Sequence, residues 1–423
     1  MQIETNVLTY TRRDVLRASG VIAAAAATLQ ILPVAQMKGV AQLAPLELGV
    51  VLPRSAAYAH LSESILAGLR LYFAQHSGRS IALRTRELAP GSGAIGAAVE
   101  QLQASGPLDF LIGMVTPAVA AQLHERLVAS GTVFVNATVG ANVPREIDRS
   151  AHVLHSSLAH WEASWALGRW AAQHLGRRGI VATSLYDSGY DALYAFRRGF
   201  EGGGGTILAT HITHLAGGGS DDSAIAPLLG QNADFVYASY SGQAAVDFVR
   251  AYARAGLATR LPLIGSSFLT DEGILDAQGD DALGIRTAAT WSPDLDNVAN
   301  QRFTTGYRAQ TGQVPDILAV LGFETARVID LAAGATGTAT VRAAGLAAGL
   351  AAGQLLGPRG AVALDVATQV VSGPIYLREV GATATGPAHA TVATLTSPNT
   401  TDAAIAALRR SPKTGWLTPY LCG

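Results

Sequence analysis

Short apolar runs alternate with amphipathic segments along this chain, and this alternation constrains the fold more than any other feature. In the first series, the expected strands lie at 46–52, 81–88, 109–112 and 133–136, with helices between them at 62–75, 94–104 and 117–129. The helices are assigned because apolar residues recur there at helical spacing. Strands that alternate with helices predict a parallel sheet with helices on both faces.

The same alternation starts again after about residue 155. The second series has helices at 160–174, 191–200, 222–229 and 243–255, and strands at 179–185, 206–211, 234–238 and 262–265. Later segments predict helices at 298–311 and 317–335, a third helix at 341–352 that is left open, and strands at 361–364, 374–380 and 390–395. The expected fold class is therefore α/β, with two doubly wound parallel-sheet lobes joined by several crossovers.

The returning segments also predict how the chain is divided. We expect residues 46–157 and 291–372 in lobe 1, residues 158–290 and 373–395 in lobe 2, and a C-terminal extension at 396–423. Ligands of open α/β sheets bind outside the carboxyl ends of the strands. Two such lobes that face each other define a cleft, and hinge closure can trap a ligand there.

Composition excludes several classes of protein. The 423 residues are 49% hydrophobic, which allows two domains with substantial cores. Only 14% are charged and the formal net charge is −1, whereas a nucleic-acid-binding protein needs clustered Lys and Arg. The one cysteine, Cys422, permits no intramolecular disulfide, and we interpret it as incidental.

The first 41 residues have the pattern of an export signal. Arg12 and Arg13 precede two apolar stretches, 21–27 and 29–34, which are too short and Ala-rich for a membrane span. The paired arginines resemble a twin-arginine signal, with cleavage after Ala41 or, as the alternative, Ala35. The other interpretation is an uncleaved amphipathic helix. We expect the mature protein in the periplasm, without stable membrane insertion.

Motifs for other chemistry are weak. A G-x-G-x-x-G pattern at 91–96 follows the second expected strand, and no acidic residue ends a strand about twenty positions later. No G-x-S-x-G nucleophile motif occurs. The histidines at 152, 155, 160, 211 and 214 form local clusters that lack matched further ligands. The expectation is no catalytic site, no metal and no cofactor.

Several stretches, in order, resemble the branched-chain-amino-acid family of periplasmic binding proteins, which has the type I fold. They are Leu48–Pro53, Asp109–Gly113, the turn Asp187-Ser188-Gly189-Tyr190 with Asp191 where Gly is usual, Ala233–Tyr237, Leu261–Gly265, Phe303–Tyr307 and Phe323–Ala326. The resemblance implies a monomeric binding protein that captures a small molecule for an ABC importer and does no chemistry on it. The importer's permease subunits would be its partners.

The ends of the expected strands supply the candidate ligand contacts. Thr116 caps a helix that Pro117 opens, and its free N–H groups suit a carboxylate, although capping alone explains the pattern equally well. The family places a carboxylate-binding Ser near this turn. Asn136 and Thr138 end the next strand, where the family often uses backbone and Thr hydroxyl groups. Tyr190 matches the ligand-facing Tyr of the family.

Other candidates come from loops near the expected cleft. Tyr240 and Ser241 follow the strand at 234–238, so they should reach the cleft. Tyr suits the wall of a ligand site because it combines an apolar ring with a polar hydroxyl group. The further candidates are Tyr58, Trp161, Phe268 and Trp291. For these four, hydrophobic packing or a hinge role is an equally good interpretation.

Ser267 is the informative departure from the family. Amino-acid binders of the family carry a carboxylate near this position, which pairs with the α-ammonium of the ligand, and a buried unpaired ammonium is costly. Ser266 and Ser267 supply only hydroxyls. We therefore expect an amide or urea-like ligand, or a carboxylic acid without the α-amine. The alternatives are a branched-chain amino acid, a periplasmic sensor of the same fold or, less favoured, an exported α/β enzyme.

Overall fold

The computed structural model describes residues 45–54, 60–76, 80–89, 93–143, 145, 153–213, 222–334, 355–365, 370–398 and 403–410. Both sheets belong to one compact unit that begins at Ala44. Within the described ranges, no helix has the length and apolar character needed to cross a membrane. Tyr58, the interval 341–352 and Cys422 lie outside the described residues.

The first sheet has eight strands in the order β11-β12-β13-β5-β4-β3-β1-β2. Their bounds are β1 Leu46–Pro53, β2 Ile81–Leu88, β3 Phe110–Gly113, β4 Val133–Thr138, β5 Val153–Ser157, β11 Leu355–Gly357, β12 Gly360–Asp365 and β13 Val370–Ser372. Strands β1 to β5 and β13 pair in parallel, while β12 runs antiparallel to both of its neighbours. The sheet is therefore mixed at the edge that the C-terminal part of the chain supplies.

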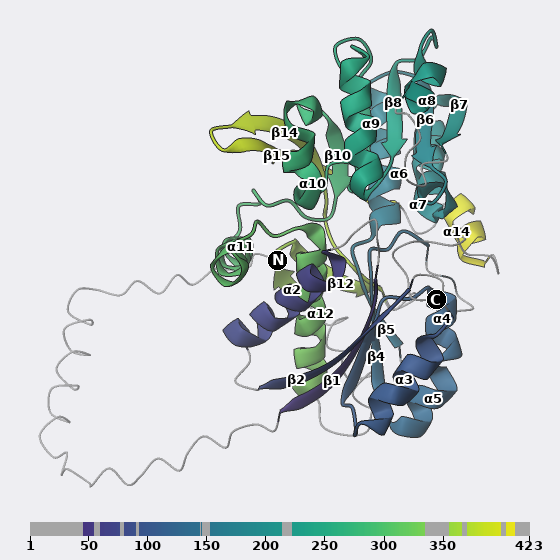
Figure 1. Ribbon diagram of the computed structural model, residues 1–423. Helices are drawn as coiled ribbons and strands as arrows, with labels where there is room; N and C mark the ends of the chain where they lie inside the picture. The colour runs from purple at the N-terminus through teal and green to yellow at the C-terminus, as the bar shows by residue number, and fades with distance from the viewer. Residues whose placement is uncertain are drawn as a thin grey trace, which may run out of the picture. The chain divides into compact units, whose positions relative to one another are not determined.

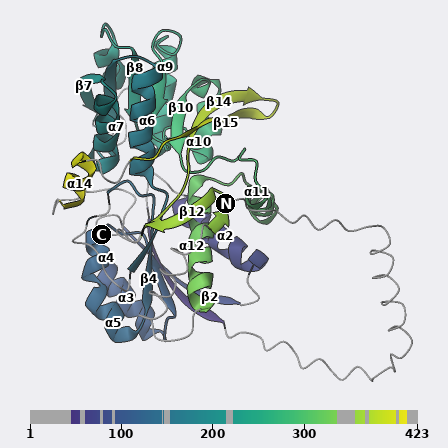
Figure 2. The same ribbon diagram turned by 180° about the vertical axis from the view of Figure 1, so that it is seen from behind.

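The second sheet has seven strands in the order β15-β14-β10-β9-β8-β6-β7. Their bounds are β6 Arg178–Ser184, β7 Thr206–Thr213, β8 Phe235–Ser239, β9 Leu263–Gly265, β10 Arg286–Ala289, β14 Ile375–Thr383 and β15 Gly386–Leu395. β14 runs antiparallel to β10 and forms a hairpin with β15. Figures 1 and 2 show this yellow-green hairpin beside β10.

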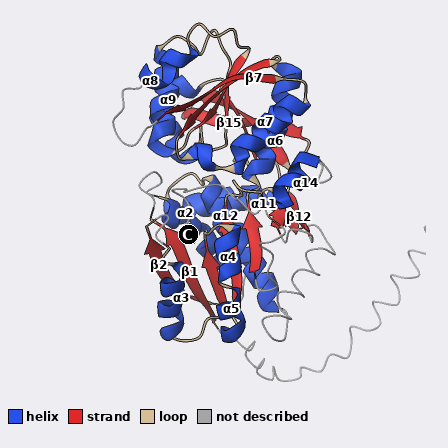
Figure 3. Ribbon diagram, turned by 90° about the vertical axis from the view of Figure 1, so that its right-hand side faces the viewer, coloured by secondary structure: helices blue, strands red, loops and turns tan. Residues whose placement is uncertain are grey.

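Helices cover both faces of each sheet, as Figure 3 shows. On the first sheet they are α2 Leu61–His76, α3 Ile95–Ala104, α4 Pro117–Gln122, α5 His124–Ser130, α11 Val298–Thr311 and α12 Ile317–Gly334. On the second they are α6 His160–His174, α7 Asp191–Gly202, α8 Asp222–Ile225, α9 Gly242–Arg254 and α10 Glu272–Gln278. We call each sheet with its helices the first and the second lobe. A further helix, α14 Ala403–Arg410, follows them.

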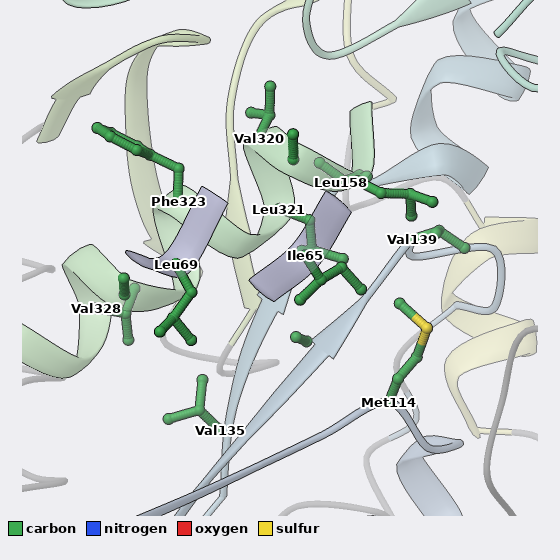
Figure 4. Close-up of a cluster of buried hydrophobic side chains, with 14 of the residues drawn as sticks. Ile65, Leu69, Met114, Val135, Val139, Leu158, Val320, Leu321, Phe323 and Val328 are labelled. Atoms are coloured by element: carbon green, nitrogen blue, oxygen red, sulfur yellow. The ribbon is translucent and has the colours of Figure 1, made fainter. Parts of the chain in front are cut away.

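Alternation of side chains along the strands builds a core on each face. Val50 packs with α2 and α12, whereas its neighbour Val51 packs with α3 and α5. Figure 4 shows the first of these cores, in which Ile65 and Leu69 of α2 meet residues of α12. In the second lobe, Tyr237 packs toward α6 and α7 and Val236 toward α9. Successive strand residues point to opposite faces, so apolar runs such as these require cover on both sides.

Glycines bring the covering helices into backbone contact. A Cβ placed on Gly68 of α2 would lie 2.0 Å from the carbonyl oxygen of Ala319 in α12. In the second lobe, a Cβ on Gly168 of α6 would lie 2.2 Å from the carbonyl oxygen of Phe196 in α7. Because real Cβ atoms do not approach an oxygen so closely, glycine is required at both crossings.

The chain passes between the sheets after β5, after β10 and after β13. These passages run through 157–160, 289–298 and 372–375. Each leaves the carboxyl end of a strand in one lobe and continues in the other lobe. The cleft-facing ends of the strands are therefore close to the connecting segments.

The α/β class and the two lobes are confirmed, with corrections in detail. The strands β5, β10, β11 and β13 were not predicted, and at the edge of each sheet that the C-terminal part of the chain supplies, strands pair antiparallel rather than parallel. The helix expected at 117–129 is interrupted at Leu123, and that expected at 222–229 becomes a 3₁₀ turn over Ala226–Leu228. Pro227 in that turn lacks the N–H that a continuing α-helix needs. The lobe boundaries remain a prediction.

Candidate functional site

A small cavity lies where the carboxyl ends of strands from both lobes meet. Its free volume is about 10 Å³, so its walls nearly touch, and it lies between segments at the ends of β4, β5, β6, β8 and β9. Its lining consists of Val139, Ala141, His160, Asp187, Tyr190, Ala192, Ser239, Ser266 and Phe268. The combination of apolar walls with a few polar groups is typical of a small-molecule site.

A second, narrower space, which leaves no room for a water molecule, shares part of this wall. Val139, His160 and Phe268 line both spaces, and Ser267 lines the second one. The remaining lining residues are Leu158, Ala163, Ala289, Thr290 and Ile317. His160 and Phe268 therefore form the partition between the two spaces.

Asp187 is the acidic group of the cavity wall. Ser184 Oγ donates to its Oδ2 at 2.7 Å, and Ser241 Oγ lies 3.0 and 3.1 Å from its two oxygens. Burial raises the pKa of Asp187 to about 6, although the two hydroxyl groups stabilise the charged form. This carboxyl group can therefore change its protonation state near neutral pH.

His160 and Ser267 form a buried polar pair at the start of α6. The Ser267 Oγ lies 3.0 Å from His160 Nδ1, and the imidazole meets the Phe268 ring edge-to-face at 5.2 Å. Burial lowers the pKa of His160 to about 4, so the ring is neutral at physiological pH. A neutral imidazole offers one N–H donor and one acceptor.

Of the predicted contacts, Tyr190 and Phe268 line the first cavity and Ser267 lines the second. Tyr190 ends the turn after β6 in extended backbone and caps α7, which places its ring at the wall. Ser241 does not line either space, but its hydroxyl group bonds to Asp187 behind the wall.

Other predicted contacts have structural partners. Asn136 is fully buried, and its amide bonds to the backbone N–H and carbonyl of Val115 at 3.1 and 3.0 Å. Thr116 accepts from the N–H of Val119 at 3.2 Å, as a helix cap does. Thr138 is half-buried at the end of β4.

Aromatic candidates also pack in the cores. Tyr240 stacks on Phe248 at 4.3 Å and accepts from the Thr213 hydroxyl at 3.2 Å. Trp161 is buried in the core of the first lobe, and Trp291 donates from Nε1 to Asn300 at 2.8 Å. Ligand contact at these positions, and at those of the preceding paragraph, stays a prediction.

Motifs and periodicity do not mark Asp187, His160, Ser239 or Ser266 as site residues. Asp187 stands in the turn that carries the family resemblance, so its position before Tyr190 was an available signal. His160 was considered only as a possible metal ligand. Ser239 and Ser266 end or follow β8 and β9, and the position of a strand's end cannot be fixed to one residue from periodicity.

Asp191 links the two lobes beside the cavity. Its carboxylate pairs with Arg145 Nη1 at 3.0 Å and accepts from the N–H of Val143 at 2.9 Å. The N–H of Ala192 donates to the carbonyl of Ala141 at 2.9 Å. Residues 141–145 follow β4 of the first sheet and residues 191–192 begin α7 of the second lobe, so these bonds join the two walls.

Comparisons with known proteins agree with this arrangement. The sequence pattern of a family described as periplasmic binding protein matches residues 45–386. A Leu/Ile/Val-binding protein homolog 6 from Brucella melitensis is 26% identical over 344 residues, which cover 79% of this chain and 87% of the relative.

Two solved structures illustrate the likeness in three dimensions. An ABC transporter solute-binding protein from R. palustris, in complex with benzoate, is 27% identical with a TM-score of 0.71 and covers 84% of this chain and 98% of its own. A leucine-, isoleucine-, valine-, threonine- and alanine-binding protein from Brucella ovis shares the fold, with a TM-score of 0.67 and 16% identity. That alignment covers 84% of this chain and 97% of the other.

Proposed function

Because the chain belongs to the periplasmic binding protein family, we propose that it captures a small aromatic carboxylic acid without an α-amine and delivers it to an ABC importer. The observation that carries this proposal is the pair of Ser267 and His160. Amino-acid binders of the family have a carboxylate near position 267, whereas this chain has a hydroxyl group 3.0 Å from a neutral imidazole. A ligand ammonium would find no charge there.

The wall suits a flat apolar ligand with one polar end. The rings of Phe268 and Tyr190 and the side chains of Val139 and Ala141 supply apolar surface. His160 and the hydroxyl groups of Ser239, Ser266 and Tyr190 can donate to a carboxylate. The solute-binding protein from R. palustris with benzoate, at 27% identity, supports the same ligand class.

A branched-chain amino acid is the second candidate, and Asp187 is the observation that favours it. This carboxyl group lines the first cavity and could pair with an ammonium. Its oxygens already accept from Ser184 and Ser241, which lowers the gain from a further donor. The curated relative named as a Leu/Ile/Val-binding protein homolog keeps this candidate open.

Calorimetric titration of the purified protein distinguishes the candidates. Benzoate, benzamide and leucine serve as probes, after ligand that copurifies has been removed by unfolding and refolding. Benzoate should bind most tightly, and its recovery unchanged would support binding without catalysis. Tight binding of leucine with no benzoate signal would refute the proposal in favour of the second candidate.

Export belongs to the same proposal. We infer that residues 1–41 direct the chain to the periplasm and that Arg12 and Arg13 are read by the twin-arginine pathway. A reporter fused to residues 1–41 should be exported, and replacing both arginines with lysine should stop export. Export that continues in this variant would indicate a different pathway but would leave the ligand proposal intact.

A further inference from the structure

A second cluster of polar side chains lies apart from the cavity, at the junction of three helix starts. His60 precedes α2, Asp316 precedes α12, and Asp271 is the residue before α10. One donor atom from each, the imidazole nitrogen and two carboxylate oxygens, lies within 4.8 Å of the others. The first two residues belong to the first lobe and Asp271 belongs to the second.

The hydrogen bonds of this cluster hold the carboxylates in place. Asp316 accepts from the Ala319 N–H through Oδ1 and from Ser64 Oγ through Oδ2, both at 2.7 Å. Asp271 accepts from the N–H of Gly273 through Oδ1 at 3.0 Å. These bonds fix the rotamers of both acids, which is what a preorganised ligand set requires.

One carboxylate oxygen of Asp271, Oδ2, lacks a hydrogen-bond donor among the described residues. Asp271 is 0% exposed, and this oxygen is buried with no hydrogen-bond partner in the described part of the chain. A buried carboxylate oxygen without a donor is costly, so native proteins rarely leave one. One oxygen of this carboxyl group lies within 4.8 Å of donor atoms of His60 and Asp316, and His60 Nε2 and Asp316 Oδ2 are themselves 3.5 Å apart.

The local charge balance favours a cation. Glu272 lies next to Asp271, and its Oε1 already pairs with Arg378 Nη1 at 2.8 Å. His389 lies 3.7 Å from the same oxygen, and burial lowers its pKa well below the usual value, so it is neutral. Burial raises the pKa values of Asp271, Glu272 and Asp316, and neighbouring carboxyl groups raise those of Asp271 and Glu272 further. One guanidinium therefore faces three buried carboxyl groups.

His60 is the partly exposed member of the cluster. Its side chain is 34% exposed, whereas that of Asp316 is 6% exposed. A Cβ added at Gly273 would lie 2.8 Å from His60 Nε2, so the glycine after Glu272 allows the imidazole to approach the start of α10.

We propose that His60, Asp271 and Asp316 bind one divalent transition-metal ion and that this ion joins the two lobes. One imidazole nitrogen with two carboxylate oxygens is a donor set that Zn²⁺ accepts, at bond lengths of about 2.0–2.2 Å. Donors of a common ion then lie roughly 3–4 Å apart, so donors that lie within 4.8 Å of one another need only a small approach of the two lobes to complete the site.

Such an ion would couple metal binding to closure of the cleft. It contacts both lobes only when Asp271 lies against His60 and Asp316, so it binds that arrangement selectively. A ligand that selects one conformation shifts the population toward it. The metal should therefore strengthen capture of the transported molecule without touching it.

Calorimetric titration of the chelator-treated full chain with ZnCl₂ alone tests the proposal. The wild type should bind one equivalent, and Asp271→Asn, which retains an acceptor for Gly273, should bind more than about tenfold more weakly. Asp276→Asn, at an exposed acid on the same helix, is the matched control and should bind as the wild type does. His60→Ala, at a partly exposed position, tests the site if Asp271→Asn does not fold.

The outcomes are distinct. A Zn²⁺-dependent rise in melting temperature in the wild type and the control, but not in Asp271→Asn or His60→Ala, would support the site. No Zn²⁺ binding by the wild type, or equal binding by Asp271→Asn and His60→Ala, would overturn it. If the wild type binds no Zn²⁺ and Asp271→Asn is more stable than the wild type without metal, Asp271 and Asp316 share a proton instead.

Discussion

Arg145 and Asp191 form a buried ion pair in which Nη1 lies 3.0 Å from Oδ2, and the guanidinium side chain is only 1% exposed. The pair links the segment after β4 to the start of α7, hence the first lobe to the second. Asp191 also lies in the turn that carries the resemblance to the branched-chain family, directly after Tyr190.

Asp191→Asn should lower the free energy of unfolding by about 3–5 kcal/mol, because it removes the charge of a carboxylate that lies 3.0 Å from a buried guanidinium. Denaturant unfolding measures the change. Glu201→Gln is the control: it breaks the Arg197 pair on the exposed surface of α7, where the expected loss is about 0–1 kcal/mol. The double variant Arg145→Met with Asp191→Asn should recover part of the loss. Equal effects of Asp191→Asn and Glu201→Gln would contradict the buried link.

The pH dependence of the ligand affinity should show whether the ligand is an anion or a cation, because the ionisation of Asp187 changes with pH. Its pKa of about 6 means that it is mostly ionised at pH 7.5 and mostly protonated at pH 5.5. An anionic carboxylate favours the protonated form, so binding takes up a proton and affinity rises as the pH falls. An ammonium ligand favours the ionised form, and its affinity falls over the same interval.

The affinity for benzoate should therefore be roughly three- to tenfold higher at pH 5.5 than at pH 7.5, as calorimetric titration at both pH values can measure. A carboxylic acid with a pKa near 4 stays ionised in this window, and His160, with a pKa of about 4, stays neutral. Asp187→Asn should remove the dependence. The same slope in this variant would assign the titration to another group.

Much of the fold follows from periodicity, and the exceptions have physical causes. The helix at 160–174 coincides with its prediction because its apolar residues recur at helical spacing over four turns. β10 escaped prediction because its residues, Arg-Thr-Ala-Ala, form no apolar run, whereas β9, with three residues, lies within one. Whether a late strand such as β14 pairs parallel or antiparallel depends on its partner, which local sequence does not contain.

The site was less predictable for a similar reason. Tyr190 could be inferred from the turn that carries the family resemblance, but the pairing of His160 with Ser267 joins positions 107 residues apart. Nothing local marks Asp271 and Asp316 as neighbours, because each is an ordinary residue before a helix until the lobes bring them together. Long-range pairs of this kind require the tertiary structure.

Helix crossings should tolerate no side chain at their closest points. Gly168→Ala should lower the unfolding free energy by more than 1 kcal/mol, because the new methyl group meets the Phe196 carbonyl backbone at 2.2 Å. Gly96→Ala is the matched control on α3, where nothing lies within 4 Å of the added Cβ. There the better helix propensity of Ala should stabilise the protein by about 0.5–1 kcal/mol. A stable Gly168→Ala variant would show that α6 and α7 can separate at little cost.

Phe268 should determine the preference for an aromatic ligand. Its ring lines both spaces and meets His160 edge-to-face, so Phe268→Leu keeps apolar volume but removes the aromatic surface. Aromatic pairs contribute about 0.5–1.5 kcal/mol beyond area burial, which predicts a loss of benzoate affinity of roughly 2- to 12-fold. Affinity for cyclohexanecarboxylate should change much less. Phe248→Leu, which alters the stack with Tyr240 in the core of the second lobe, controls for indirect effects. If both acids weaken equally in Phe268→Leu, the ring acts by filling space and not by aromatic contact.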